Sequence, residues 1–372
     1  MPADHRKRTI SCLEDTSEHT LKEIFRQPLL WPTTLEIVLS ASERLRLPDK
    51  FKQARVLFTG AGSSAYAATA VASAFPCAVA VPTTDLLVDA GHYLRGIEAV
   101  ISLARSGDSP ESAAVVDLVR AIRPDVFQLA IVCNEHGALA DSRLDGVIVL
   151  DPRTNDSSLV MTSAFSNLVL AGQILSQGNA AGAAVHELSE RATALLTDIN
   201  RACKYVASQI HDRIVVLSSS PLLGWGREAG LKVLEMTAGR FSSVTETYLG
   251  IRHGPMSFVK PDTIVLCLLS SDPVRRLYEE DLLRELRTKG IGYLVGIANP
   301  SESEGLFDEV IPAVAPRAND TLRTPFEILG PQLLGYHLSI GIGLNPDNPS
   351  PDGVISRVVQ GVRIHPAGPS EL

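Results

Sequence analysis

The stretch ISLARSGDSP, residues 101–110, contains the pattern on which this chain is built. An apolar run with β propensity ends in a short loop of Ser, Gly and Asp, and Pro110 opens the next segment, PESAAVVDLVRAI. Serine is a good residue just before a helix, and proline fits the first helical position. The pattern therefore predicts a buried strand, a tight turn and a helix.

The same plan recurs on both sides of this stretch. RVLFTGAGSSAYAATAVASAF, which begins at Arg55, has the pattern of a strand, a Gly-rich turn and an Ala-rich helix. VFQLAIVCN and GVIVLD are further short apolar strands, and SSLVMTSAFSNLVLAGQILSQG is a long helical pattern. Near-continuous apolar strands between helices indicate a parallel sheet that is covered on both faces. Residues 54–178 therefore form one predicted α/β unit.

A second unit repeats the first. DRIVVLSSSPLLGWGREAGLKVLEMTAG, from Asp212, repeats the strand–turn–helix plan, and DTIVLCLLSSDPVRRLYEEDLLREL matches the stretch around residue 101. The sequence therefore predicts an α/β protein with two doubly wound parallel-sheet domains of one type in tandem. We expect an N-terminal helical segment (1–48), a first domain (49–195), a second domain (196–345), with a helical connector around 185–210, and an irregular C-terminal tail (346–372).

Length and composition agree with two globular domains and argue against several partners. The chain has 372 residues, of which 45% are apolar, and its formal net charge is −8. At about 150 residues per domain this length predicts two domains. The only basic cluster is short, His5–Arg8, so we expect no nucleic-acid partner.

Targeting and metal signals are missing from the sequence. No apolar stretch reaches the roughly 18–20 residues of a membrane helix, and the N-terminus lacks the apolar core of a signal peptide. We therefore expect a cytoplasmic protein with no membrane partner. The five cysteines are scattered without a Cys-x-x-Cys pair, which argues against a zinc site and a disulfide framework.

The loops that end the strands have the composition of an anion site. In open parallel sheets, ligands bind beyond the carboxyl ends of the strands, where helix N-termini present free N–H groups. The loops are Gly60–Ser64, Ser106–Pro110 and the Ser/Thr-rich turn 156–163. Three hydroxyl-rich helix starts on one rim favour a phosphorylated ligand. The alternative is that each loop only caps its own helix.

A nicotinamide cofactor is a weaker interpretation. Gly60-Ala61-Gly62 begins like a dinucleotide fingerprint, but Ala65 stands where the third glycine is needed. Asp85, near the end of the next strand-like run, is its only other support.

The motifs resemble the sugar isomerase (SIS) domain family, in particular its two-domain sugar-phosphate isomerases. The closest likeness is to the galactosamine-6-phosphate deaminase/isomerase branch, once called tagatose-6-phosphate ketose/aldose isomerase. LARSGDSPES, MTSAFSNLVLAGQ, LLGWGREAGLKVLEMTAG and RHGP carry the resemblance, which covers about residues 20–365. It implies conversion of a 6-phospho-amino sugar, D-galactosamine 6-phosphate, to D-tagatose 6-phosphate and ammonium, without a metal or redox cofactor.

The resemblance also implies roles for particular residues. Glu235 matches the base that enolises the sugar, and His253 matches a ring-opening histidine that reaches into the neighbouring subunit's site, so at least a homodimer is expected. Lys232 matches a lysine of the family. The implied substrate-binding residues lie in three segments: Gly62, Ser63 and Ser64; Arg105, Ser106 and Ser109; and Val160 with Met161.

The chain departs from the related glucosamine-6-phosphate synthases at several positions. Ala104 removes a hydroxyl, and Arg105 replaces a glutamine and can offer a phosphate a charge-assisted bond. The last lysine is Lys289, so the synthase's C-terminal lysine is missing; Arg363 and His365 are the tail's candidates for its role. The sequence contains no stretch that resembles a glutaminase domain, so we do not expect synthesis of an amino sugar from glutamine.

The residue pattern itself supports Glu235 as a base. On a helix that starts near Gly226, Glu228, Lys232 and Glu235 share one face beside an apolar stripe. We expect partial desolvation to raise the pKa of Glu235. The alternative is an exposed ion pair between Glu235 and Lys232.

His253 precedes Gly-Pro, which predicts a loop. There, the adjacent Arg252 is expected to disfavour the imidazolium form of His253. Two other functions remain open: aldose–ketose isomerisation without deamination, and a sensor that binds a sugar phosphate without turnover.

Overall fold

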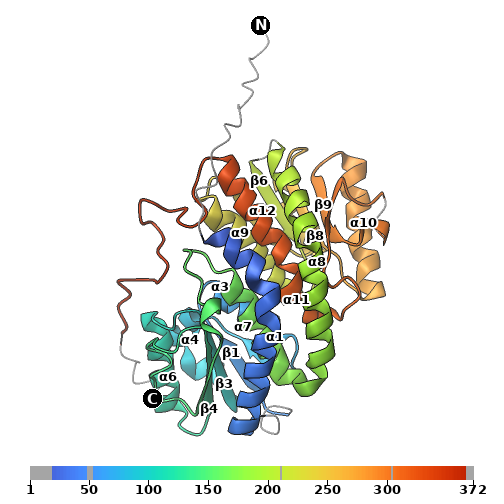
Figure 1. Ribbon diagram of the computed structural model, residues 1–372. Helices are drawn as coiled ribbons and strands as arrows, with labels where there is room; N and C mark the ends of the chain where they lie inside the picture. The colour runs from blue at the N-terminus through green and yellow to red at the C-terminus, as the bar shows by residue number, and fades with distance from the viewer. Residues whose placement is uncertain (1–18, 48–52, 210–211, 303–304, 366–372) are drawn as a thin grey trace.

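Two parallel sheets form the frame of the protein. The computed structural model describes residues 19–47, 53–209, 212–302 and 305–365 (Figure 1). Each sheet has five strands, all neighbouring pairs are parallel, and the orders are β2-β1-β3-β4-β5 and β10-β9-β8-β6-β7. The strands are β1 (Val56–Thr59), β2 (Ala78–Ala80), β3 (Ala99–Ala104), β4 (Phe127–Val132), β5 (Gly146–Val149), β6 (Arg213–Leu217), β7 (Ser242–Glu246), β8 (Ile264–Leu268), β9 (Tyr293–Ala298) and β10 (Glu309–Pro312).

This architecture confirms the predicted fold class of two doubly wound parallel sheets. The second strand of each unit lies at one edge and the first lies beside it, so both sheets have the order 2-1-3-4-5. The central strands β1, β3 and β8 are buried along their whole length, and β6 is buried after Arg213, as their apolar sequences predict.

Helices cover both sheets. They are α1 (Thr20–Leu45), α3 (Ser63–Ala72), α4 (Thr83–Val88), α5 (Ala90–Tyr93), α6 (Pro110–Ile122), α7 (Ser163–Gln177), α8 (Gly182–Ser208), α9 (Leu223–Met236), α10 (Pro273–Lys289), α11 (Asp320–Glu327) and α12 (Leu329–Gly341). In the predicted N-terminal helical segment, α1 continues through Pro28 and Pro32 because its apolar face is buried. None of the described helices is both long and apolar enough to cross a membrane.

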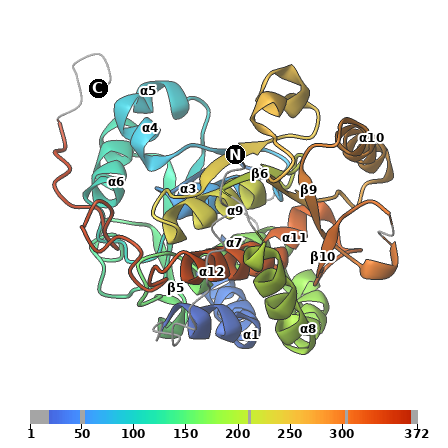
Figure 2. The same cartoon turned by 90° about the horizontal axis from the view of Figure 1, so that it is seen from above.

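The two sheets share one hydrophobic core. A single cluster of buried apolar residues includes Phe58 and Ile131 of the first sheet, Val216 and Leu266 of the second, and Trp225 of α9 between them. The long helices α1 and α8 run side by side along one side of the molecule; α1 contacts α7 and α12, and α8 contacts α12 (Figures 1 and 2). The two halves are therefore joined by packing as well as by the chain.

A close approach of α3 and α9 sets how the halves meet. A Cβ added to Gly224 in α9 would lie 2.6 Å from the backbone N of Ala70 and 2.7 Å from the backbone O of Tyr66, both in α3. Backbone cannot yield as a flexible side chain can, so only glycine fits at this crossing. The contact brings the C-terminal half of α9 towards the loops that follow β1 and β3.

Candidate active site

A cavity of about 180 Å³ lies at the carboxyl end of the first sheet. Most of the predicted site residues line it: Gly62, Ser63, Ser64, Arg105, Ser106, Ser109, Met161 and Glu235. Three predicted residues do not line it. Val160 is buried. Lys232 does not line the cavity but contacts Ser63 and Glu235, which do. His253 is exposed on another part of the chain.

The first loop presents an open helix start. Gly62 precedes α3 with φ +56°, a backbone conformation that favours glycine. No side chain caps this helix, and Ser63 and Ser64 are buried in its first turn. The partial positive charge of the α3 N-terminus is therefore free to act on a bound anion.

The second loop is open in a similar way. Ser109 precedes α6, but its hydroxyl donates to the carboxylate of Glu111 and makes no capping bond to the backbone. The side chain of Asn134 stabilises the turn by donating to the carbonyl of Ser106 at 3.1 Å. Gly107 has φ +72°, a backbone conformation that favours glycine. These contacts fix the loop without closing the helix N-terminus.

The third loop differs from the expectation that all three helix starts face one ligand. The carboxylate of Asp156 accepts hydrogen bonds from the backbone N–H groups of Thr162 (2.8 Å), Ser163 (3.2 Å) and Ala164 (2.8 Å). An internal anion thus already occupies the N-terminus of α7, and the capping interpretation holds for this loop. Its contribution to the cavity wall comes from Leu159 and Met161.

Arg105 lines the cavity, but the bonds of its guanidinium go to the protein. Its Nη1 donates to the carbonyls of Ser158 (3.1 Å) and Leu159 (3.0 Å), and its Nη2 donates to the carbonyl of Arg357 at 2.5 Å. Burial, and next the like charge of Arg357, lower the pKa of Arg105. Arg105 therefore brings positive charge to the cavity while most of its donors hold the surrounding backbone.

Three charged side chains of α9, Glu228, Lys232 and Glu235, contact one another, as their spacing predicts. The Nζ of Lys232 lies 3.3 Å from Oε1 of Glu228 and 2.6 Å from Oε2 of Glu235, and it donates to the hydroxyl of Ser63 at 3.1 Å. Lys232 and Glu228 are fully buried, whereas the Glu235 side chain is 24% exposed and faces the cavity. The exposed ion pair considered as the alternative is thus not what forms: the ammonium is buried and is shared.

The sequence pattern did not predict that Glu228 is buried. Burial raises its pKa to about 7, and the charge of Lys232 opposes the shift. Burial also disfavours the charge on Lys232, but Glu228 and Glu235 outweigh it, so the pKa of Lys232 is raised. The face of the helix was predictable from the three- and four-residue spacing; the depth of Glu228 depends on how α9 packs.

His253 lies apart from this cavity. It ends the short helix η3 (Gly250–His253) and is exposed. The neighbouring Arg252 pairs with Glu285, with 2.7 Å between Nε and Oε2. Within one chain, the predicted ring-opening histidine does not meet the predicted base.

The C-terminal segment completes the cavity. Residues 350–365 leave the second half, run beside the first sheet and supply the wall from Ile355 to Val359 (Figure 1). The tail candidates Arg363 and His365 are exposed and do not line the cavity, whereas Arg357 does. An irregular segment has no periodicity, so the sequence contained no signal for this placement.

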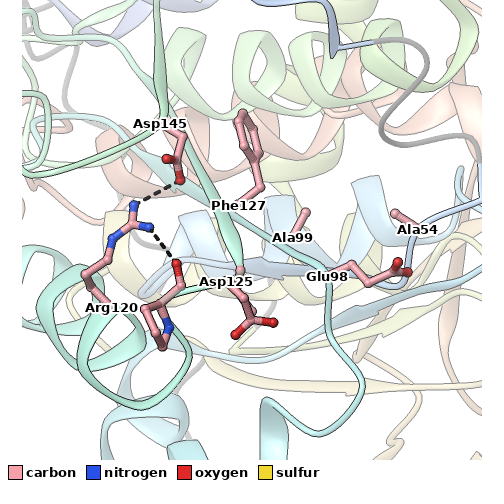
Figure 3. Close-up of a pocket in the computed structure, with 9 residues that line it drawn as sticks. Ala54, Glu98, Ala99, Arg120, Asp125, Phe127 and Asp145 are labelled. Carbon is pink, nitrogen blue, oxygen red and sulfur yellow. Dashed lines mark hydrogen bonds and ion pairs between the residues drawn. The ribbon is translucent and has the colours of Figure 1, made fainter.

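A larger hollow of about 370 Å³ lies at the opposite, amino end of the first sheet (Figure 3). Its charged groups are matched internally: Arg120 pairs with Asp145 at 2.9 Å, and Glu98 accepts from the backbone N of Arg55 at 2.8 Å. None of the predicted site residues lines it. The smaller cavity is the better candidate because it combines open helix N-termini with a partly buried carboxylate.

Known proteins are similar to this chain over more than nine-tenths of its length. It is 36% identical over 368 residues, 93% of this chain and 92% of the other, to the D-galactosamine-6-phosphate deaminase AgaS of Shewanella sp. strain ANA-3. A crystal structure from Clostridium novyi NT matches with a TM-score of 0.88 and 32% identity, covering 95% of this chain and 96% of the other. The tagatose-6-phosphate ketose/aldose isomerase of Escherichia coli matches with a TM-score of 0.81 and 30% identity, covering 93% and 96%. No protein-family model matches the chain.

Proposed function

Because this chain belongs to the family of the D-galactosamine-6-phosphate deaminase AgaS, and is thereby a sugar-phosphate isomerase/deaminase, we propose that it converts D-galactosamine 6-phosphate to D-tagatose 6-phosphate and ammonium. The observation that carries the proposal is the meeting of Glu235, from the second half of the chain, with the Ser63 and Ser106 loops of the first half in one cavity. The activity for which the relatives are named supports this choice of substrate.

The phosphate of the substrate binds at the open N-termini of α3 and α6 in this proposal. Backbone N–H groups, the hydroxyls of Ser63, Ser64 and Ser106, and the charge of Arg105 favour a dianion there. The phosphate is remote from the reacting carbons, so its binding energy serves to position them. The sugar then extends from the loops towards Glu235.

Glu235 is the base in this mechanism. Once the ring is open, its carboxylate takes the proton from C2 and returns a proton to C1. The first transfer gives an enol that bears an amine at C2, and the second gives the C2 imine of the ketose. Lys232, 2.6 Å from Oε2, holds the carboxylate in place.

Water completes the deamination. It adds to the C2 imine, and the carbinolamine loses ammonia to give the C2 ketone of D-tagatose 6-phosphate, so one water is consumed for each ammonium released. Atoms and electrons balance without an oxidant or reductant.

Ring opening requires a proton to move between O1 and O5, and His253 is the group proposed for it. His253 is exposed and does not line the cavity of its own chain. We therefore propose a homodimer in which a second copy of the chain supplies its His253 to this cavity, as the family resemblance implies. The site is then complete only in the assembly.

A second candidate is aldose–ketose isomerisation without deamination, favoured by the name of the E. coli structural relative. The test is a panel of hexosamine, N-acetylhexosamine and hexose 6-phosphates, scored separately for ketose and ammonium. Equal amounts of ketose and ammonium from D-galactosamine 6-phosphate support the deaminase. Ketose from D-galactose 6-phosphate, with no ammonium from the amino sugar, supports the isomerase. Binding without either product would overturn both and indicate a sensor.

A further inference from the structure

Two arginines meet at the wall of the candidate active site. Arg105 follows β3 in the first half of the chain, and Arg357 lies in the C-terminal segment, residues 350–365. The Nη2 of Arg105 donates to the backbone carbonyl of Arg357 at 2.5 Å. The like charge of Arg357 contributes to the lowered pKa of Arg105, after burial. Both residues line the same cavity.

Arg357 also holds the C-terminal segment against the first half of the chain. Its Nε and Nη2 donate to the backbone carbonyl of Asp156 at 2.9 and 2.7 Å, and Nη2 donates to the side-chain oxygen of Asn155 at 2.6 Å. Among the described residues, each hydrogen bond that joins 350–365 to the rest of the chain has an atom of Arg357 at one end.

The rest of the segment has little else to hold it. It contains no helix or strand, and the hydrogen bonds of Ser350, Ile355 and Ser356 remain within the segment. Val354 and Val359 are 86% and 50% exposed, so little apolar area is buried. The segment is therefore held over the cavity mainly by the side chain of Arg357, together with the bond from Arg105 to the Arg357 carbonyl.

Arg105 and Arg357 bring two positive charges to the wall of the cavity, to which Glu235 contributes one carboxylate. Asp156 and Glu235 favour the charge on Arg105, but the oxygens of Asp156 already accept from the first turn of α7. Two guanidinium groups beside each other repel, and a dianion between or beside them converts that repulsion into attraction. An anion in the cavity thus stabilises the closed segment.

We propose that Arg357 is a positioning residue that couples phosphate binding to closure of the C-terminal segment over the cavity. This inference rests on the proposed phosphosugar site and adds to it. Besides anchoring the substrate, the phosphate stabilises the closed position of the C-terminal segment, which forms one wall of the cavity. A sugar without a phosphate does not stabilise the closed position of the segment, so the wall of its binding site is less stable. The enzyme therefore discriminates against unphosphorylated sugars partly through residues 354–359.

Hydrogen exchange of the full-length protein tests the coupling, with inorganic phosphate as the probe and chloride at equal ionic strength as the reference. In the wild type, phosphate is expected to slow amide exchange at residues 61–66, at 106–112 and at 354–360. In Arg357→Ala, the first two regions keep this response and 354–360 loses it. Arg363→Ala, which removes the same charge from an exposed position in the same segment, keeps all three responses.

Steady-state kinetics give the second readout. Charge-assisted contacts of this kind predict that Arg357→Ala raises KM for the 6-phosphosugar about tenfold to a hundredfold. Arg357→Lys, which keeps the charge but not the planar fork, is expected to recover part of that loss, and Arg363→Ala to change KM less than about twofold.

The outcomes separate the inference from the function on which it rests. Phosphate protection at 61–66 and 106–112 without any change at 354–360 in the wild type would overturn the coupling and leave the phosphate site intact. Protection of 354–360 that survives in Arg357→Ala would also overturn it. No protection in any region would overturn both the phosphate site and the coupling.

Discussion

The Nζ of Lys232 lies 2.6 Å from the carboxylate of Glu235 and 3.1 Å from the hydroxyl of Ser63, so one buried ammonium joins the proposed base to the proposed phosphate loop. Lys232 and Glu235 come from α9, and Ser63 comes from α3. The crossing of these helices at Gly224 therefore sets the position of the proposed base relative to the proposed phosphate loop.

Glu235→Gln is expected to lower kcat by about 100- to 10,000-fold, the usual contribution of a positioned general base. The amide keeps the shape of the side chain but cannot take the C2 proton. Ammonium release and ketose formation are measured together with the melting temperature. Glu190→Gln, at an exposed position of α8, is the matched control and retains wild-type turnover. Full activity of Glu235→Gln would show that another group is the base.

Lys232→Met is expected to destabilise the fold by about 3–5 kcal/mol, because it leaves Glu228 buried without its cation. The free energy of unfolding by urea measures this loss. Combining Lys232→Met with Glu228→Gln removes the buried charge and is expected to restore a substantial part of the stability. Equal loss in the single and double variants would contradict a role for the buried charge pair.

The stability of the protein depends on pH through Glu228. Its pKa is about 7 in the folded state and near 4.5 when unfolded, so between these values the folded state binds more protons. Stability from this group is greatest below about pH 4.5 and falls as the pH rises towards 7. The measurement is unfolding free energy at pH 5 and pH 8 for the wild type and Glu228→Gln.

Subtracting the two proteins isolates Glu228, because Glu23, Glu279 and Glu327 also have raised pKa values and remain in both. Relative to Glu228→Gln, the wild type is expected to lose about 2–3 kcal/mol between pH 5 and pH 8. The same pH dependence in both proteins would mean that Glu228 titrates normally.

Mixing two inactive variants tests whether the site is shared. Glu235→Gln lacks the base and His253→Asn lacks the ring-opening group, so each is expected to be inactive alone. After unfolding and refolding together in equal amounts, heterodimers hold one intact site, and activity returns to about a quarter of the wild-type value. Recovery only in the mixture supports a His253 donated by the neighbouring copy. No recovery, with a dimer present in solution, would place both groups in one subunit.

Much of the fold followed from local pattern. The continuous apolar runs at 99–104 and 264–268 predicted buried parallel strands, and their Ser, Asp and Pro turns predicted helix starts. The three- and four-residue spacing of Glu228, Lys232 and Glu235 placed them on one helix face, and the structure has them in contact.

The rest depended on contacts between distant segments. Asp156 fills the N-terminus of α7, and no local rule distinguishes that loop from the open ones at Ser63 and Ser106. The bonds of Arg105 go to carbonyls 53 and 54 residues away and to one 252 residues away. Arg357 lies in a segment without periodicity, so its place at the cavity became visible only in three dimensions.

The central claim is that a phosphosugar lies between the serine loops of the first half and Glu235 of the second. A crystal structure of Glu235→Gln soaked with D-galactosamine 6-phosphate tests it most directly. The account predicts the phosphate within hydrogen-bond distance of Ser63 and Ser106, with C2 of the sugar facing residue 235. A sugar phosphate bound elsewhere, or with its C2 turned away from residue 235, would contradict it.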